Sequence, residues 1–507
     1  MSFTVTIKPT SITVYPGRES IDYLGPLLDL LTYEDEYVEE TKTLGYIYDE
    51  DTDLLYLHKG VDINYLKKLL IDVTFKTQKP DQAKEMDFEY EEIIPPRDDE
   101  QVDVINFITG SQHHANNITA NQIFLVLRTG AGKSFCSCTG ACKYHKRTLI
   151  IMHRDNLRNQ WIKTLLDMIG MDKNRIHEIK TTDEIVAIAH NEINMLYDYD
   201  IYLMTHATFR AGLKRLHSFE EASNITKNLG IGLKIIDEAH LEFRDTLLMD
   251  FVFNVQRNLY LTATAGRSSK EENSIFKHVF SHAVFYKPSS LLTTNMPKKW
   301  VEYTIVELDT HVKPNIYRYR VNGGRGMNPA SYGKWVIKND KKQIHFKVCT
   351  ELIRQMFEND KNSKILVFMP LIELCSEFEY FLNKTLNYDS SFEYSLELGT
   401  INSSNTKSEN ERNKKCDVII TTIASCGTGT DLPGMTGIIN CSPFVSKITA
   451  SQVFGRLRYC GKTCYFYDVY DKSVQMDVFW LKSRSKVMKS LALNVRSIKW
   501  NDDDEGE

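Results

Sequence analysis

The stretch of this chain best equipped for chemistry is residues 127–134, with the sequence LRTGAGKS. It follows a short apolar run and precedes a stretch with helical spacing, which predicts a strand, a tight turn and a helix. Gly130 and Gly132 allow the backbone to surround an anion with N–H groups, and the helix start adds partial positive charge. Lys133 can reach the β- and γ-phosphates of a nucleotide, and the Ser134 hydroxyl can bind Mg²⁺. The pattern therefore predicts a phosphate-binding loop.

One position of this loop departs from the strict pattern, because Leu127 stands where a glycine is usual. A chance glycine-rich turn is the alternative over these residues alone. The acidic pair Asp237 and Glu238 favours the phosphate loop, since it directly follows the apolar run 233–236. At a strand end beside Ser134, Asp237 could hold Mg²⁺ through water, and Glu238 could orient or deprotonate an attacking water. A solvent-facing acidic pair is the weaker alternative.

Three further polar residues stand close to these motifs. The two-sided amide of Gln101, just upstream of the loop, could bind adenine, although a surface glutamine on an amphipathic helix fits too. Thr262 and Thr264 follow another strand candidate and could link the acidic pair to a second site. Core threonines on a strand are the alternative.

A second set of polar residues lies near the C-terminus. Arg456 and Arg458 follow Gln452 within a few residues, and two arginines so close together are costly in a packed domain without an anion. They could stabilise a transferring phosphoryl group, whereas the alternative is that they are solvated helix arginines. The glycine-rich turn 425–433 precedes them and carries the acid Asp431.

Strands and helices alternate over two long segments, which predicts parallel sheets covered by helices. Ligands bind at the carboxyl ends of the strands in such sheets. In the first segment we expect strands at 123–127, 148–152, 201–204, 233–236 and 258–262, with helices at 157–168 and 182–193. In the second we expect helices at 341–358 and 474–493 and strands at 364–369, 417–421, 437–440 and 464–469.

The N-terminal residues 1–92 predict a separate α+β module. Alternating apolar residues predict a β-hairpin over 3–14, strands follow at 44–48 and 54–58, and helical spacing covers 21–33 and 62–70. An accessory domain with a solvated acidic face and a domain that recognises DNA structure both fit this pattern. A linker rich in proline and acidic residues is expected over 77–96.

Residues 291–340 show no regular pattern. Cationic and aromatic side chains interleave there, which suits phosphate contact and base stacking, but a solvated connector fits equally well. They are Arg318, Arg320, Arg325, Lys334 and Lys338 with Tyr317, Tyr319, Tyr332 and Trp335.

The composition is that of an ordinary globular chain. Of 507 residues, 42% are hydrophobic and 25% charged, and the net charge of −5 confines any nucleic-acid surface to a local patch. We find no apolar run long enough for a membrane span and no signal-peptide layout. The ten cysteines are scattered, which predicts reduced thiols in a cytoplasm-like compartment. The groups Cys136, Cys138 and Cys142, and Cys460 with Cys464, favour buried thiols over metal or redox sites.

Taken in order, these motifs resemble those of superfamily 2 helicases, with a DEAH-type motif II. Gln101 is similar to the adenine-reading glutamine, 128–134 to motif I, and 151–154 with Gln160 and Trp161 to motif Ia. Thr205 and His206 resemble motif Ib, 237–240 motif II, 262–264 motif III and 367–370 motif IV. Thr421, Thr422, Gly429 and Asp431 resemble motif V, and 452–458 motif VI. Within the superfamily, the compact chain looks most like phage branch-migration DNA helicases of the UvsW type.

The resemblance implies two RecA-like parallel-sheet lobes with ATP and Mg²⁺ between them. The implied domains are an N-terminal accessory domain at 1–92, lobe one at 93–300, an irregular connector at 301–340, lobe two at 341–475, and a helix with an acidic tail at 476–507. The implied catalytic residues are Lys133, Asp237, Glu238, Gln452, Arg456 and Arg458, with Mg²⁺ held by Ser134 and Asp237. The implied nucleotide contacts are Gln101, Thr129, Gly130, Ala131, Gly132, Lys133, Ser134, Gly429 and Asp431.

The resemblance also implies residues beyond the ATP site. His240, Thr262 and Thr264 would couple the two sites, and His153, Arg154, Thr205, His206 and Thr422 would contact nucleic acid. Motif VI departs from the family pattern, since Arg458 comes two residues after Arg456 rather than three, which leaves open which of them is the arginine finger.

The resulting hypothesis is an ATP-dependent DNA helicase or translocase that unwinds or branch-migrates forks, D-loops or four-way junctions. An RNA helicase is the first alternative, because the core motifs do not separate DNA from RNA. A nucleotide-gated nucleic-acid clamp or a restriction-type translocase is the second. No membrane partner is expected, a monomer is compatible with the sequence, and a phage-encoded chain would act in the host cytoplasm.

Overall fold

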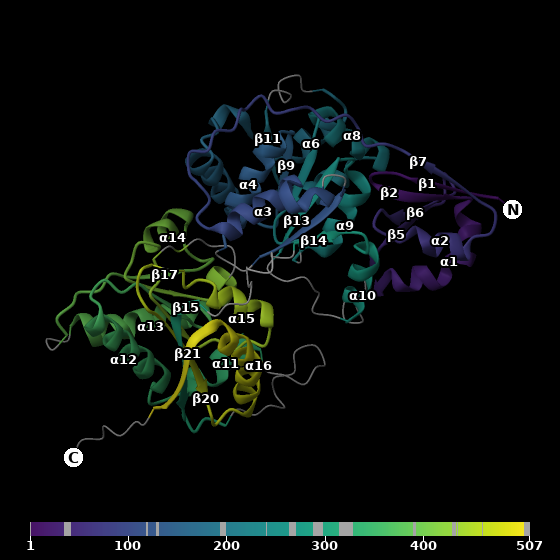
Figure 1. Cartoon of the computed structure of the whole chain (residues 1–507). Helices are drawn as coiled ribbons and strands as arrows, with labels where there is room; N and C mark the ends of the chain where they lie inside the picture. Colours follow the sequence, from purple (N-terminus) through teal and green to yellow (C-terminus); the bar gives the residue numbers. More distant parts are fainter. Residues whose placement is uncertain are drawn as a thin grey trace, which may run out of the picture. The chain divides into compact units, whose positions relative to one another are not determined.

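The computed structural model forms two compact units, one of residues 1–127 with 131–292 and one made largely of 293–507. It describes residues 2–34, 42–117, 120–127, 131–192, 199–239, 241–262, 270–286, 298–313, 328–388, 392–427, 432, 434–458 and 460–500. Figure 1 labels the elements of each unit. Among the described helices, none is long and apolar enough to cross a membrane.

The N-terminal module folds as a five-stranded mixed sheet with two helices. Its strand order is β5-β6-β2-β1-β7, and the predicted hairpin β1–β2 is confirmed as an antiparallel pair. Strand β7, which the sequence analysis does not predict, pairs parallel with β1 at the sheet edge and ends at Thr77, where the predicted linker begins. The elements are β1 (Phe3–Ile7), β2 (Ser11–Tyr15), α1 (Gly17–Leu30), β3 (Thr32–Glu34), β4 (Lys42–Leu44), β5 (Tyr46–Asp49), β6 (Leu54–His58), α2 (Ile63–Leu69) and β7 (Val73–Thr77).

The segment after β7 is extended but attached to the lobe that follows. Lys84 donates its N–H to the Gly230 carbonyl at 2.9 Å, and Arg147 donates its N–H to the Lys84 carbonyl at 3.0 Å. Met86 is buried, and Asp87 donates its N–H to Asp200 Oδ1 at 2.9 Å. The predicted linker is therefore fixed along the first lobe over much of its length.

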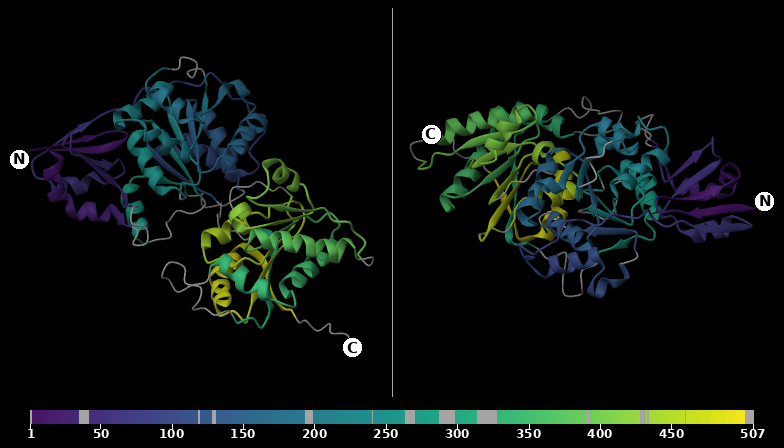
Figure 2. Two further views of the ribbon diagram at one scale, coloured as in Figure 1. Left: turned by 180° about the vertical axis from the view of Figure 1, so that it is seen from behind. Right: turned by 90° about the horizontal axis from the view of Figure 1, so that it is seen from above.

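The first lobe is a seven-stranded parallel sheet with the order β10-β11-β9-β12-β13-β8-β14. Its predicted strands are confirmed to within a residue or so at each end. Figure 2 shows helices on both faces of this sheet. The elements are α3 (Asp99–Thr109), η1 (Gln112–Asn117), β8 (Gln122–Val126), α4 (Lys133–Tyr144), β9 (Thr148–Met152), α5 (Asn156–Lys163), η2 (Thr164–Met168), η3 (Lys173–Arg175), β10 (Ile176–Glu178), α6 (Thr182–Ala189), β11 (Ile201–Thr205), α7 (His206–Leu213), α8 (Phe219–Leu229), β12 (Leu233–Ile236), α9 (Phe243–Val252), β13 (Arg257–Thr262), α10 (Lys270–Val279) and β14 (Val284–Phe285).

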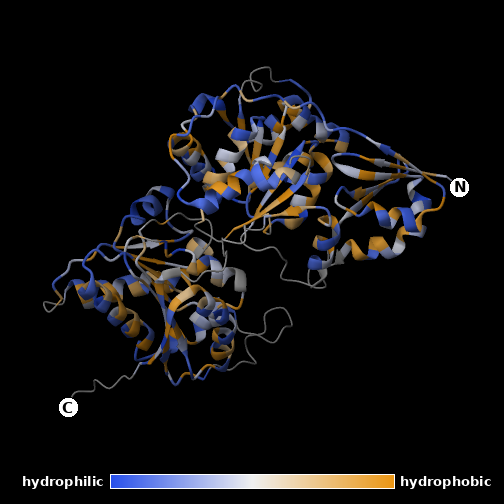
Figure 3. Ribbon diagram, in the orientation of Figure 1, coloured by the Kyte–Doolittle hydropathy of each residue, from blue (hydrophilic) through white to orange (hydrophobic). Residues whose placement is uncertain are grey.

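Alternating side chains of these strands fill two different cores. Along β11, Ile201 and Leu203 pack in the core of α3, α4 and α5, whereas Tyr202 and Met204 pack in the core of α6 to α10. Strands buried on both faces need continuous apolar runs, which is the pattern visible in Figure 3. The core on the α6–α10 face continues without a break into the N-terminal module. The module is thus part of the same unit as the first lobe rather than separate.

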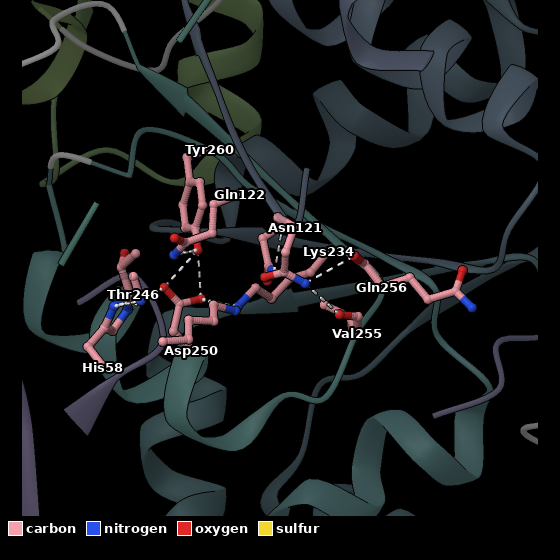
Figure 4. A network of polar contacts seen from close by, with 12 residues as sticks. His58, Asn121, Gln122, Lys234, Thr246, Asp250, Val255, Gln256 and Tyr260 are labelled. Carbon is pink, nitrogen blue, oxygen red and sulfur yellow. Dashed lines mark hydrogen bonds and ion pairs between the residues drawn. The ribbon is translucent and has the colours of Figure 1, made fainter. Parts of the chain in front are cut away.

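A buried polar network joins the module to this lobe (Figure 4). Asp250 of α9 accepts from Lys234 Nζ of β12 at 2.6 Å and from the Tyr260 hydroxyl of β13 at 2.7 and 2.8 Å. From the module, His58 Nε2 lies 3.0 Å from Asp250 Oδ2, and Lys59 Nζ lies 3.4 Å from Asp250 Oδ1. The network therefore ties two central strands of the lobe to the end of β6.

The second unit is another seven-stranded parallel sheet, with the order β17-β18-β16-β19-β20-β15-β21. Its elements are β15 (Lys298–Leu308), α11 (Pro329–Trp335), η6 (Ile337–Asn339), α12 (Ile344–Asn359), β16 (Ile365–Phe368), α13 (Ile372–Leu382), η7 (Asn383–Asn387), β17 (Leu398–Ile401), α14 (Lys407–Asn413), β18 (Val418–Thr421), η8 (Ile423–Gly427), β19 (Gly437–Asn440), α15 (Lys447–Phe454), β20 (Cys464–Asp471), α16 (Gln475–Leu491) and β21 (Ala492–Lys499).

Two segments of this unit differ from the prediction. Residues 298–308 form β15 inside the sheet, where the sequence analysis expects an irregular connector to begin at 301. The end of the predicted C-terminal helix and tail instead contains β21, which pairs parallel with β15 at the sheet edge. The second sheet therefore begins near Lys298 and ends near Lys499. Arg318, Arg320 and Arg325 of the predicted connector, and the acidic residues 502–507, lie outside the described residues.

Candidate functional site

The described end of the 127–134 loop has the backbone of an anion-binding turn. Gly132 is left-handed (φ 91°) directly before α4 begins at Lys133. A Cβ at Gly132 would lie 2.3 Å from Gln101 Nε2, so both the conformation and the space require glycine. Among the described residues no side chain caps α4, and its first N–H groups can face phosphate oxygens. Thr129 and Gly130 lie outside the described residues.

Gln101 is positioned by the start of α3 and holds this turn. Asp98 caps the helix by accepting from the Gln101 N–H at 3.0 Å. The side-chain amide of Gln101 donates to the Ala131 carbonyl at 3.2 Å and accepts from the Arg97 N–H at 2.8 Å. The side chain is buried, so its amide braces the phosphate loop. Its predicted contact with adenine stays a prediction.

The acidic pair meets the loop lysine at the carboxyl end of β12. Lys133 Nζ lies 3.1 Å from Glu238 Oε1. Asp237 is fixed by two hydrogen bonds, from its N–H to the Ile151 carbonyl at 2.8 Å and from Trp161 Nε1 to its Oδ2 at 3.1 Å. Glu238 has φ 49°, which is strained for a residue with a Cβ and is typical of functional turns. The fold thus brings Lys133, Asp237 and Glu238 together as the sequence predicts.

The electrostatics of this site leave acid in excess. Burial and the neighbouring charge of Glu238 raise the pKa of Asp237 to about 6, although Lys133 and the Trp161 hydrogen bond oppose the shift. Among the described residues, two neighbouring carboxylates lie beside Lys133, and Asp237 is buried. A divalent cation bound by the hard carboxylate oxygens would neutralise this excess. The donor set therefore fits Mg²⁺ together with nucleotide phosphates.

The second unit carries the other predicted ATP-site residues. Gln452 lies on α15 and is buried, Arg456 directly follows that helix and is buried, and Arg458 is exposed. Thr422, a predicted nucleic-acid contact, follows β18, and its hydroxyl accepts from the Ser425 N–H at 3.2 Å. Gly429 and Asp431 lie outside the described residues. Arg456 and Arg458 thus differ in exposure.

Two family models match the two units. The model described as the res subunit of type III restriction enzymes matches residues 94–267, and the model of the helicase conserved C-terminal domain matches residues 345–459. The chain belongs to helicase superfamily 2. It is accordingly an ATP-dependent enzyme that unwinds nucleic acid.

Other helicases are similar to this one along much of its length. Helicase 161L of Invertebrate iridescent virus 6 is 24% identical over 344 residues, which are 65% of this chain and 67% of that protein. Among solved structures, Mss116p bound to ssRNA and AMP-PNP has a TM-score of 0.50 and 16% identity, and the match covers 76% of this chain and 72% of that one. Dbp5 of S. cerevisiae, bound to RNA and ADP BeF3, has a TM-score of 0.49 and 13% identity, with 76% and 87% covered. The likeness to Mss116p is one of fold, that of two RecA-like lobes in tandem.

The predicted coupling residue Thr262 ends strand β13 next to the phosphate loop of the helicase. Its carbonyl accepts from the Leu127 N–H at 3.1 Å, and the preceding carbonyl, of Leu261, accepts from the Ala239 N–H at 2.9 Å. The end of β13 therefore touches both the loop and the turn of motif II. His240 and Thr264 lie outside the described residues, and their coupling roles stay predictions.

The predicted nucleic-acid contacts of the first lobe follow β9 and β11. Arg154 is exposed and His153 is partly buried after β9. Thr205 caps α7 by accepting from the Thr208 N–H at 3.1 Å. These placements lie at strand ends of one sheet edge, and direct contact with nucleic acid stays a prediction for all of them.

His206 is placed differently from the other predicted contacts. Its side chain is only 1% exposed, and its Nδ1 lies 3.7 Å from Asp245 Oδ2. Arg210 Nη1 lies 2.9 Å from the same Asp245 oxygen and is half exposed. A direct contact by His206 would require it to leave this position, whereas Arg210 is on the surface of the same helix.

Trp161 is the site residue that the sequence analysis does not assign to the ATP site. It is fully buried, lies on α5, and donates to the catalytic candidate Asp237. Its position in the motif Ia region is visible in the sequence, but the contact depends on how α5 packs beneath the end of β12. No local pattern carries that information.

Proposed function

We propose that this helicase acts on DNA and unwinds or branch-migrates forks, D-loops and four-way junctions during replication, recombination or repair. The observation that carries the proposal is the N-terminal module, whose apolar core is continuous with that of the ATP-binding lobe. A duplex held by such a module would move with the lobe as ATP turns over. A branched substrate offers duplex to the module and a separating strand to the lobes.

At the ATP site, Lys133 would bind the phosphates, and Ser134 and Asp237 would hold Mg²⁺. Glu238 would orient or deprotonate the attacking water, and its 3.1 Å contact with Lys133 places both groups at the same point. Bound Mg²⁺ would neutralise charge on the phosphate oxygens. From the second lobe, exposed Arg458 is the better candidate than buried Arg456 for the arginine finger.

The module has a surface suited to phosphates at one edge of its sheet. Lys67 and Lys68 on α2 and Lys76 on the edge strand β7 are all exposed. Lys67 Nζ lies 5.5 Å from the centroid of the Phe75 ring on β7, which joins α2 to that edge. Lysines beside aromatic side chains suit nucleic-acid backbone contact.

The proposal is tested with ATP turnover and unwinding on forked, four-way and linear DNA and on the matching RNAs. We expect stimulation by DNA and the fastest unwinding with forks and junctions. A Lys67→Ala, Lys68→Ala, Lys76→Ala variant should reduce the salt slope of junction binding by about 2 to 3, because each phosphate contact contributes about 0.9. The matched control replaces Lys173, Lys180 and Lys227, which are exposed elsewhere on the same unit.

Each alternative predicts a different result. Stimulation by RNA alone would make the chain an RNA helicase and overturn the DNA proposal. Strand separation that survives Lys133→Ala would instead indicate a clamp that does not need ATP turnover. Equal salt slopes for the module variant and its control would show that these lysines of the module do not contact DNA.

A further inference from the structure

Three potential metal ligands meet beside the helix that carries Gln101. His113 Nε2 lies 2.8 Å and His114 Nε2 lies 2.9 Å from the same oxygen, Oδ1 of Asp103. Asp103 is on α3, and the histidines are on η1 directly after it. Across the part of the chain that the structure describes, no other three side chains of His, Cys, Asp or Glu bring ligand atoms within 4.8 Å of one another.

The Asp103 carboxylate is held in place from its other side. The Tyr286 hydroxyl donates to Asp103 Oδ2 at 2.8 Å. Ligating carboxylates in metalloproteins commonly have such an outer hydrogen bond, which fixes the direction of the free oxygen.

The short helix η1 is also held in place by hydrogen bonds. The positions of the two imidazoles are therefore defined by the fold. Buried Arg257 donates to the Ile108 carbonyl at 2.6 Å and to the Asn117 carbonyl at 2.7 Å, which joins the end of α3 to the end of η1. Asn117 donates back to the Phe107 carbonyl at 3.1 Å. The His114 ring packs edge-on against Phe107, with 5.4 Å between the ring centroids.

The geometry points to a Zn²⁺ site formed by Asp103 Oδ1, His113 Nε2 and His114 Nε2. Two imidazoles and one carboxylate are a zinc donor set, whereas Mg²⁺ prefers oxygen ligands throughout. Each imidazole would bind as the neutral Nδ1–H tautomer, so that its Nε2 lone pair faces the ion. The His113 side chain is 53% exposed, which leaves the fourth position open to water.

The proposed zinc site is close to Gln101, the residue that holds the phosphate loop. Asp103 and Gln101 are two residues apart on α3, and Gln101 donates to the Ala131 carbonyl. Zinc bound to Asp103 and to the two histidines would therefore join α3, which carries Gln101, to η1. This site is distinct from the predicted Mg²⁺ ligands Ser134 and Asp237.

The experiment measures Zn²⁺ binding to the full chain, without a polyhistidine tag and in excess Mg²⁺, by competition with a chromophoric chelator. We expect one Zn²⁺ per chain, weakened by about 100-fold or more in His113→Ala and His114→Ala, and by about tenfold in Tyr286→Phe, which keeps all three ligands. Half-exposed His113 can be removed without disturbing the core. Co²⁺ in place of Zn²⁺ should give a spectrum without a thiolate charge-transfer band.

His190 provides the matched control for these variants. It is also a partly exposed histidine of the first lobe with carboxylate partners, but Glu192 and Glu221 meet different ring nitrogens. His190→Ala should leave Zn²⁺ affinity unchanged. The proposal is overturned if the wild-type chain binds no Zn²⁺, if His113→Ala binds it as tightly as the wild type, or if Co²⁺ shows thiolate ligation.

Discussion

The strands β12 and β13 carry charged or polar clusters at both ends, and the two clusters differ in what balances their charge. At the carboxyl ends, Lys133 Nζ lies 3.1 Å from Glu238 Oε1, and the pKa of Asp237 is raised to about 6 by burial and by Glu238. Nearer the amino ends, Asp250 meets two lysines and a histidine. Burial alone would raise the pKa of Asp250, but Lys234, Lys59 and His58 hold it well below its ordinary value.

The difference distinguishes a cluster that stabilises the fold, around Asp250, from a site that binds a charged ligand, around Asp237. In the Asp250 cluster, two lysines and a histidine surround the carboxylate, and the side chains of all four residues are at most 5% exposed. At the Asp237 site, burial and the charge of Glu238 raise the pKa of Asp237, so its protein surroundings stabilise the ionised form less well. Charge repulsion retained at a buried site costs stability and is a mark of function. The comparison therefore predicts opposite effects on stability for substitution of Asp237 and of Asp250.

The largest effect is expected at the ATP site, at the carboxyl ends of β12 and β13. Lys133→Ala should lower the rate constant of nucleic-acid-stimulated ATP turnover by about 10³-fold, because it removes a positive charge from the transferring phosphoryl group. Turnover within tenfold of the wild type would show that this lysine is not part of the ATP site.

The largest stability effect is expected at the other end. Asp250→Ala should lower the free energy of unfolding of the first unit by about 3–5 kcal/mol, because it leaves Lys234 and Lys59 buried without a counter-charge. The measurement is urea unfolding followed by hydrogen exchange of β12 peptides. As the matched control, a triple variant with Asp250→Leu, Lys59→Met and Lys234→Met should lose less stability. An equal loss would mean that volume rather than charge is responsible.

Asp237→Asn should stabilise the nucleotide-free protein while it abolishes turnover. Its folded-state pKa of about 6 lies above the ordinary value of 3.8, so ionisation costs stability as the pH rises through this window. The variant should therefore be more stable than the wild type above pH 6, by about 1–2 kcal/mol, and equal to it below about pH 4. Unfolding measured against pH without Mg²⁺ checks this, and a constant difference across pH would contradict it.

The smallest effect is expected at Lys59. Burial lowers the pKa of Lys59 to about 7 from 10.5, so its charged form costs stability that is greatest below pH 7 and vanishes toward pH 10.5. Lys59→Met should raise the free energy of unfolding by about 1 kcal/mol at and below neutral pH, since a packed side chain replaces a desolvated charge. A gain that is the same at pH 10 as at pH 7 would show that packing alone is responsible.

The sequence predicts the ATP site well, because each of its motifs lies within a few consecutive residues. The apolar run 233–236 followed by two acids, and the turn containing Gly132 followed by Lys133, each describe a strand end and its chemistry within a few residues. Strand β12 is confirmed from Leu233 to Ile236. The meeting of Lys133 with Glu238 then follows from the parallel sheet.

The Asp250 cluster could not be predicted, because the residues that contact one another are far apart in the sequence. Lys234 interrupts an apolar strand, and the residues near it in the sequence do not indicate that Asp250 of α9 is its buried partner. They also do not indicate that His58, at the end of β6, contacts the same carboxylate. Strand β15 was missed for a related reason. Its charged residues, such as Glu302 and Glu307, alternate with apolar ones, and β21, its partner on one side, lies almost 200 residues away. Pairing of this kind depends on tertiary context.

Glu238→Gln tests the central claim most directly, since it removes charge but almost no volume at the ATP site. We predict that ATP turnover in saturating nucleic acid falls by about 10²–10³-fold, while the free energy of unfolding stays equal to or above that of the wild type. Turnover near the wild-type rate, or a loss of stability like that of Asp250→Ala, would contradict the assignment of Lys133, Asp237 and Glu238 as the ATP site.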